Sequence, residues 1–213
     1  MIFMQLKKSY KARKKQIRQR LLEFQAVWSE PEERIFSELA FCFCTPQSKA
    51  KSCWDAVSCL QDSGLLYRGS QDDIRRTLHR KVRFHNNKSS YILHARNLFM
   101  ESGRLSIKKR LLEKGTPYEM REWLVSKMKG MGYKEASHFL RNIGLGKDIA
   151  ILDRHILKNL KKHGVIGKVP KTLTPKKYKE IESQMAEFSR KVGIPMEEMD
   201  LLFWSQETGE VFK

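Results

Sequence analysis

The chain has no long apolar run, and its acidic residues are scarce relative to its basic ones. No segment approaches the roughly 20 apolar residues that a membrane-spanning helix needs, so the sequence predicts no membrane segment. The short apolar part of the N-terminus comes before its basic residues, which is the reverse of a secretory signal. We therefore expect a cytoplasmic protein.

The charge balance is strongly positive. Lys and Arg number 42 against 24 Asp and Glu, which leaves a formal net charge of +18. Such a charge repels itself in a compact chain unless a polyanion is the usual partner, so the composition favours nucleic acid. The basic stretches at 7–20 and 158–168 are compatible with phosphate contacts and equally with solvated helix faces.

Strand signals are also missing, because no run alternates strictly between apolar and polar residues. Helical signals recur instead, and we predict an all-α fold. Cysteine is confined to one apolar region, without a histidine or a Cys-x-x-Cys pair beside it. We expect reduced core thiols there rather than disulfides or a metal site. The four cysteines are Cys42, Cys44, Cys53 and Cys59.

Helix starts are indicated by capping residues and by proline in the first turn. The segments that carry these signals are Ser29–Glu32, Ser70–Asp73, Asn86–Asn87, Thr116–Glu119, Asp153, Thr174–Pro175 and Pro195. Glycine or proline follows several of the expected helices and predicts their ends, near Thr45–Pro46, Gly144 and Gly164. The sequence therefore predicts a series of helices joined by short loops.

The most informative segment, residues 129–134, reads Lys-Gly-Met-Gly-Tyr-Lys between two expected helices. Gly130 and Gly132 lack a Cβ atom, so the backbone can turn tightly and bring N–H groups against a phosphate. Two helices joined by a Gly-x-Gly turn match the helix-hairpin-helix module, which grips DNA phosphates without reading sequence. Lys134 then falls in the first turn of the second helix.

Lys134 and Asp153 together suggest a reaction on DNA. A neutral amine can displace a base at the sugar C1′ atom and form a Schiff base, after which β-elimination cleaves the strand. Nearby positive charge and a helix N-terminus favour the neutral form of an amine. Asp153 is a good helix cap, and its carboxylate also suits stabilisation of a cationic sugar. A solvated lysine and a purely structural cap are the alternatives.

With these residues the chain resembles the bifunctional helix-hairpin-helix DNA glycosylases, and among them the archaeal-type 8-oxoguanine DNA glycosylase/AP lyase family. The likeness covers nearly the whole chain. It is supported by Leu39–Lys49, by Phe84–Lys88 ahead of Tyr91–Ile92, and by Asp200–Trp204 together with Lys213. The iron–sulfur branch of the superfamily is not matched, because no cysteine follows Cys59.

The resemblance implies roles for residues whose context alone is neutral. The implied DNA contacts are Gly130, Gly132, His155, Gln47, Asn86 and Asn87, with Gln47 as the wedge that fills the place of an extruded base. The implied base-recognition residues are Trp204 and Lys213, whose terminal carboxylate would accept the N7 hydrogen that distinguishes 8-oxoguanine from guanine. Each of these residues also has a structural interpretation. These are a surface histidine for His155, a polar turn for Gln47, ordinary helix caps for Asn86 and Asn87, a core aromatic for Trp204 and a frayed tail for Lys213.

We therefore expect a two-lobed helical protein with Lys134 and Asp153 in the cleft between the lobes. Residues 30–150 would form the helix-hairpin-helix lobe, and 1–29 with 151–213 the second lobe. The expected function is removal of 8-oxoguanine and β-lyase cleavage by a monomer acting on double-stranded DNA that contains an oxidised base, without metal or organic cofactor. A glycosylase for another lesion, such as an oxidised pyrimidine, and a DNA-binding module without chemistry remain alternatives.

Overall fold

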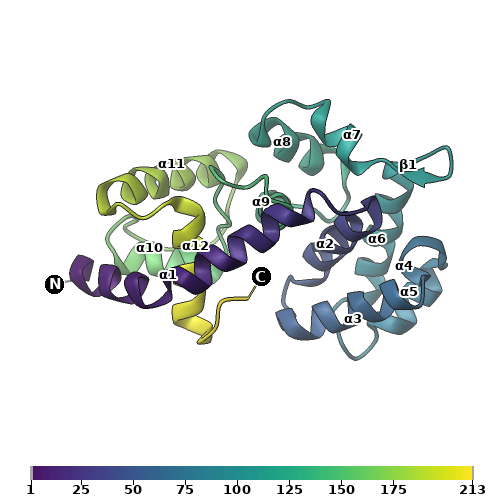
Figure 1. Ribbon diagram of the computed structural model, residues 1–213, viewed down its shortest axis with the longest axis horizontal. Helices are drawn as coiled ribbons and strands as arrows, with labels where there is room; N and C mark the ends of the chain where they lie inside the picture. The colour runs from purple at the N-terminus through teal and green to yellow at the C-terminus, as the bar shows by residue number, and fades with distance from the viewer. Residues whose placement is uncertain (1, 213) are drawn as a thin grey trace. The chain divides into compact units, whose positions relative to one another are not determined.

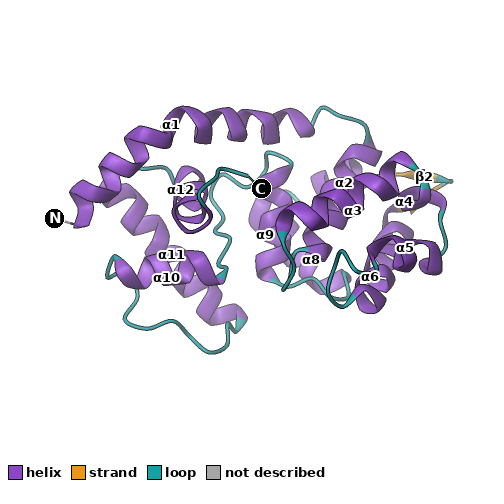
Figure 2. Cartoon of the chain, turned by 90° about the horizontal axis from the view of Figure 1, so that it is seen from below, coloured by secondary structure: helices purple, strands orange, loops and turns teal. Residues whose placement is uncertain are grey.

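The computed structural model describes residues 2–212, and helices form most of them (Figures 1 and 2). Two compact units are present. The internal unit is Val27–Phe139, and the terminal unit is formed by the described residues of 1–26 and 140–213. The sequence-based division at residues 30 and 150 stays a prediction about functional lobes. No helix among the described residues is long and apolar enough to cross a membrane.

The internal unit contains most of the helices. Its elements are α2 (Glu32–Cys44), α3 (Ala50–Asp62), α4 (Leu65–Arg68), α5 (Gln71–Leu78), α6 (His85–Phe99), β1 (Met100–Glu101), β2 (Arg104–Leu105), α7 (Ile107–Leu112), α8 (Pro117–Lys127) and the first part of α9 (Tyr133–Asn142). Helix α2 packs against α3, α6 and α7, and every residue from Ile35 to Cys44 is buried. Since burying one large apolar side chain stabilises a fold by about 1.5–3 kcal/mol, α2 is the centre of this unit's core.

The helical fold expected from the sequence is confirmed, with one short strand pair in addition. Strands β1 and β2 pair antiparallel, with Met100 opposite Leu105. Between them, Ser102 and Gly103 have φ values of 50° and 78°, as a two-residue hairpin turn requires. Two residues per strand are too few to give an alternating pattern, which is why the sequence did not predict them.

The terminal unit combines α1 (Ile2–Val27) with α10 (Arg154–Lys162), α11 (Pro175–Val192) and α12 (Met196–Thr208). Helices α10 and α11 both pack against α12. Helix α1 buries one stripe of side chains, including Ile17 and Phe24, while most of its basic residues stay exposed. The basic stretch at 7–20 is therefore largely a solvent-facing helix surface in this unit.

Several predicted helix starts are confirmed by their capping hydrogen bonds. Ser70 with Asp73, and Thr116 with Glu119, each form a reciprocal capping box. The Thr174 hydroxyl accepts a hydrogen bond from the Lys177 amide at the start of α11. These signals were readable because both partners lie within three or four residues of one another.

Two predicted caps are wrong. Helix α2 begins after Pro31, with no side-chain cap, and Glu32 instead accepts hydrogen bonds from the amides that begin α7, including that of Ile107 at 2.7 Å. Helix α6 begins at His85, after Phe84 in a left-handed conformation, so Asn86 and Asn87 lie inside its first turn. In α2, the glutamate of the expected capping box binds a partner distant in sequence. In α6, the helix begins earlier than predicted.

Candidate functional site

The predicted hairpin is present between α8 and α9, and Gly130 is its essential glycine. Gly130 has a φ of 79°, and a Cβ atom there would collide with the Tyr91 ring of α6. Gly132 is not in the left-handed region, and its carbonyl accepts the Ala136 amide at 3.0 Å. The tight turn and close approach expected of both glycines thus apply to Gly130, while Gly132 begins α9.

Lys134 lies in the first turn of α9, as predicted. Its side chain is 23% exposed, which makes it neither a freely solvated lysine nor an inaccessible one. Its Nζ donates a hydrogen bond to Thr45 Oγ1 at 3.3 Å and lies 3.8 Å from a Glu135 carboxylate oxygen. Thr45 in turn donates to the Cys42 carbonyl, so the partner of the amine is itself fixed to the end of α2.

Asp153 caps α10, as predicted. Its Oδ1 accepts the amides of His155 and Ile156, both at 2.8 Å. Both bonds use the same oxygen, and the structure gives Oδ2 no hydrogen-bond partner among the described residues. One carboxylate oxygen therefore shapes the helix start, while the other takes no part in the cap.

The extended segment before Asp153 is fixed by two side chains of α11 that the sequence did not single out. The Tyr178 hydroxyl donates to the Ala150 carbonyl at 2.6 Å and accepts the Leu152 amide at 3.2 Å. Glu182 accepts the Ala150 amide at 2.7 Å. The sequence signal that could have revealed these contacts is a tyrosine and a glutamate one turn apart on the apolar face of α11.

His155 and Trp204, both in the terminal unit, are half-buried. The His155 ring lies 3.9 Å from a carboxylate oxygen of Glu207, which Lys158 also binds at 2.7 Å. Trp204 lies on α12 with part of its surface exposed, so it is not a simple core aromatic. Lys213, the other base-recognition residue implied by the resemblance, lies outside the described residues.

The predicted wedge and the two asparagines occupy neighbouring turns of the internal unit. Gln47 is exposed and has a φ of 56°, a left-handed conformation that is unusual for a residue other than glycine. Asn86 and Asn87 are exposed as well. The Arg83 amide, just before α6, donates to Ser48 Oγ at 3.0 Å. The structure thus brings together the loop that contains Gln47 and the start of α6.

Three of the four cysteines are buried core thiols, as expected, but Cys59 is exposed. Burial raises the pKa of the Cys53 thiol to about 11, which keeps this group protonated at neutral pH. No cluster of metal-ligating side chains is found among residues 2–212.

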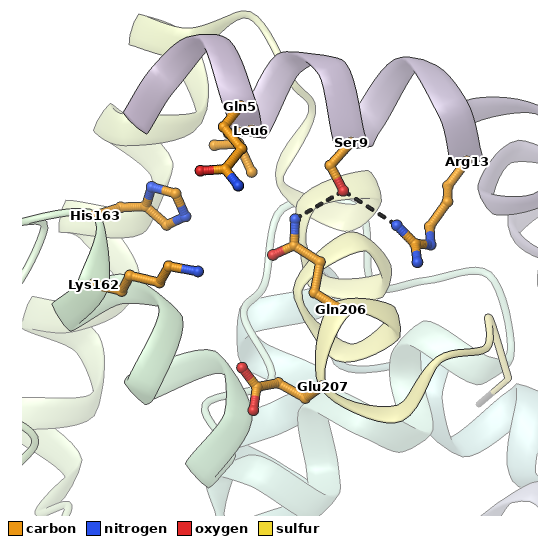
Figure 3. Close-up of a pocket in the computed structure, with 8 residues that line it drawn as sticks. All are labelled: Gln5, Leu6, Ser9, Arg13, Lys162, His163, Gln206 and Glu207. Carbon is orange, nitrogen blue, oxygen red and sulfur yellow. Dashed lines mark hydrogen bonds between the residues drawn. The ribbon is translucent and has the colours of Figure 1, made fainter. Parts of the chain in front are cut away.

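A cavity of about 320 Å³ lies in the terminal unit (Figure 3). Its lining side chains are Gln5, Leu6, Ser9, Arg13, Lys162, His163, Gln206 and Glu207. The Ser9 hydroxyl accepts hydrogen bonds from Gln206 and Arg13 (Figure 3). None of the predicted site residues that the structure describes lines this cavity, so it is not the predicted catalytic site.

Comparison with known proteins identifies the family. The model of the Ogg-HhH family, described as 8-oxoguanine DNA glycosylase, matches residues 17–194. A protein of Fusobacterium nucleatum named 8-oxoguanine DNA glycosylase/AP lyase is 47% identical over 99% of this chain and 97% of its own length. A protein of the same name from Methanocaldococcus jannaschii is 35% identical, over 92% of this chain and 91% of its own.

Solved structures agree. The 8-oxoguanine DNA glycosylase of Thermotoga maritima is 31% identical and superposes with a TM-score of 0.88, covering 100% of this chain and 98% of its own. The Methanocaldococcus jannaschii enzyme in complex with a 15mer DNA containing 8-oxoguanine is 33% identical, with a TM-score of 0.88 over 99% of this chain and 100% of its own. This chain therefore belongs to the 8-oxoguanine DNA glycosylase family.

Proposed function

We propose that this chain excises 8-oxoguanine from double-stranded DNA and then cleaves the strand at the abasic site, with Lys134 as the nucleophile. Its curated relatives are named for both activities, and one solved relative is in complex with DNA that contains 8-oxoguanine. The observation that carries the assignment to Lys134 is a partly exposed amine, bonded to the Thr45 hydroxyl, in the first turn after the hairpin.

The excision step begins when neutral Nζ of Lys134 attacks C1′ of the lesion nucleotide. The bond between C1′ and N9 breaks, and its electron pair leaves with the base, which takes up a proton. Positive charge develops on the sugar as the base leaves, and the free carboxylate oxygen of Asp153 stabilises it. Nζ then passes one of its protons to the ring oxygen O4′, the bond between C1′ and O4′ breaks, and a protonated Schiff base to Lys134 results.

The cleavage step uses the same intermediate. The protonated Schiff base acidifies the C2′ hydrogen; when that proton is removed, the bond between C3′ and its oxygen breaks and the phosphate leaves. Water hydrolyses the remaining Schiff base and frees Lys134. Neither step draws on a metal or an organic cofactor.

DNA binding is proposed to use residues of both compact units. Gly130, Gly132 and His155 would contact phosphates, and Gln47, Asn86 and Asn87 would act where the base is extruded. Trp204 and Lys213 would contact the lesion base. We further propose that the protein works as a monomer. Because its proposed substrate is the DNA of the cell, we also propose that it acts in the cytoplasm.

Borohydride trapping tests the proposal. Duplexes with a single 8-oxoguanine, a single oxidised pyrimidine or no lesion are incubated with the protein and reduced. We expect a covalent protein–DNA adduct with 8-oxoguanine, and none when Lys134→Gln replaces the wild type. An adduct with the oxidised pyrimidine alone would change the assigned lesion. Unimpaired DNA binding with no adduct on any lesion would leave only a DNA-binding module.

A further inference from the structure

Lys88 is a buried lysine that the proposed chemistry does not use. It belongs to the first turn of α6 and is only 4% exposed. Its Nζ donates to the carbonyls of Cys44 and Pro46, both at 2.7 Å, and to Ser48 Oγ at 3.3 Å. The described residues offer it no carboxylate at ion-pair distance.

Such a position is unfavourable for a lysine. An ammonium group loses its hydration on burial, and three neutral oxygen atoms replace that hydration only in part. Burial lowers the pKa of Lys88. Because burial of this cation is unfavourable, we looked for a role of its hydrogen bonds in the segment that they contact.

All three acceptors lie in one short stretch of chain. Cys44 ends α2, whose last carbonyls have no partner within the helix and carry the negative end of its dipole. Pro46 and Ser48 belong to the loop that follows, residues 45–49, here called the 45–49 loop. Lys88 therefore ties this loop to the beginning of α6.

The same loop holds two residues of the proposed site. Gln47, the proposed wedge, lies between two of the acceptors of Lys88 and has a left-handed backbone conformation. A residue other than glycine keeps such a conformation only when its surroundings impose it. Thr45, beside the other acceptor, bonds to Lys134. The hydrogen bonds of Lys88 thus surround both the wedge and the partner of the nucleophile.

We propose that Lys88 is a positioning residue for base extrusion, which holds the 45–49 loop in the conformation that presents Gln47 to the DNA. This inference rests on the proposed function. It assigns Lys88 no contact with the substrate. Its hydrogen bonds set the loop conformation, and its place in the first turn of α6 fixes the loop relative to Asn86 and Asn87.

Substrates that differ in the need for extrusion test this role. Single-turnover rates are measured for excision from duplexes with 8-oxoguanine and for cleavage of duplexes with a preformed abasic site, which has no base to unstack. Lys88→Met removes the donors at similar length. We expect slower excision by roughly 10- to 100-fold, the effect of a misplacement of about 1 Å, and little change at the abasic site.

Three further variants make the result specific. Lys88→Arg retains charge and donors and should restore most of the excision rate. Ser48→Ala removes one acceptor and the link to Arg83, and should reproduce the selective defect more weakly even if Lys88→Met fails to fold. Lys109→Met replaces an exposed lysine of the same unit and should leave both rates unchanged.

Each outcome decides between the two proposals. If the wild type neither excises 8-oxoguanine nor forms an adduct, the proposed function fails. Lys88 has no role in extrusion if the wild type is active but Lys88→Met and Ser48→Ala slow excision and abasic-site cleavage equally. The same conclusion holds if these variants change neither rate. Failure of Lys88→Arg to restore excision, with unchanged thermal unfolding, would also overturn the inference.

Discussion

At the scale of single residues, Asp153 combines a structural and a proposed chemical role in one carboxylate. Its Oδ1 caps α10 through two amide hydrogen bonds, while Oδ2 is without a partner among the described residues. An uncharged amide oxygen can replace the first role but not the second. The two roles are therefore separable by substitution.

We predict that Asp153→Asn folds with nearly the wild-type free energy of unfolding but excises 8-oxoguanine more slowly by roughly 10²- to 10³-fold, because the stabilising charge is lost. Asp153→Ala should in addition lose about 1 kcal/mol of stability, the usual effect of removing an N-cap. Urea unfolding and single-turnover excision measure the two effects. Wild-type excision by the asparagine variant would show that the carboxylate only caps the helix.

At the scale of elements, the hairpin between α8 and α9 depends on one glycine more than on the other. Gly130 combines a φ of 79° with close packing against Tyr91, whereas a Cβ at Gly132 would meet only the flexible end of Glu135, at 3.2 Å. A motif written as Gly-x-Gly thus contains two positions with different physical requirements.

We predict that Gly130→Ala destabilises the protein by roughly 1–3 kcal/mol, because a strained backbone conformation and a steric clash act together. Gly132→Ala serves as the matched control and should change the free energy of unfolding little. Urea denaturation compares the free energies of unfolding of the two variants. Their affinity for duplex DNA reports on the conformation of the hairpin. Equal stability of both variants would contradict this account of the turn.

The segment that leads to Asp153 is a second element whose position depends on buried polar groups. Tyr178 bonds to Ala150 and Leu152 through its hydroxyl. We predict that Tyr178→Phe loses about 1–3 kcal/mol of stability and also slows excision, because Asp153 follows this segment directly.

Tyr10 offers a control in the same unit, because its buried hydroxyl donates to Glu198 and not to this segment. Tyr10→Phe should reduce the free energy of unfolding without slowing excision below the melting range. If both phenylalanine variants slow excision equally, the effect of Tyr178 is one of general stability and not of positioning Asp153.

At the scale of the whole molecule, short-range signals were readable from the sequence and long-range partners were not. The capping boxes at Ser70 and Thr116 and the start of α9 at the hairpin depend on neighbouring residues, and the structure confirms them. Glu32 binds an amide 75 residues away, and Lys88 a carbonyl 44 residues away. Such partners are set by tertiary packing, which no local pattern reports.

The family could be identified from the sequence because its motif is local, but the residues that support the motif could not. Lys134 follows the hairpin by two positions, so both were visible in one segment. Thr45, Lys88 and Tyr178 have no motif of their own, since a threonine, a lysine and a tyrosine in helical surroundings occur in any protein. Their roles become visible only when the atoms that they contact are known.

Lys134 is proposed to form the covalent intermediate, and mapping that bond identifies the residue that carries it. The adduct trapped by borohydride on an 8-oxoguanine duplex is digested with protease and nuclease, and mass spectrometry locates the modified residue. We predict that the remnant of the sugar is attached to Nζ of Lys134. Attachment to a different amine, or excision of 8-oxoguanine by Lys134→Gln at the wild-type rate, would contradict it.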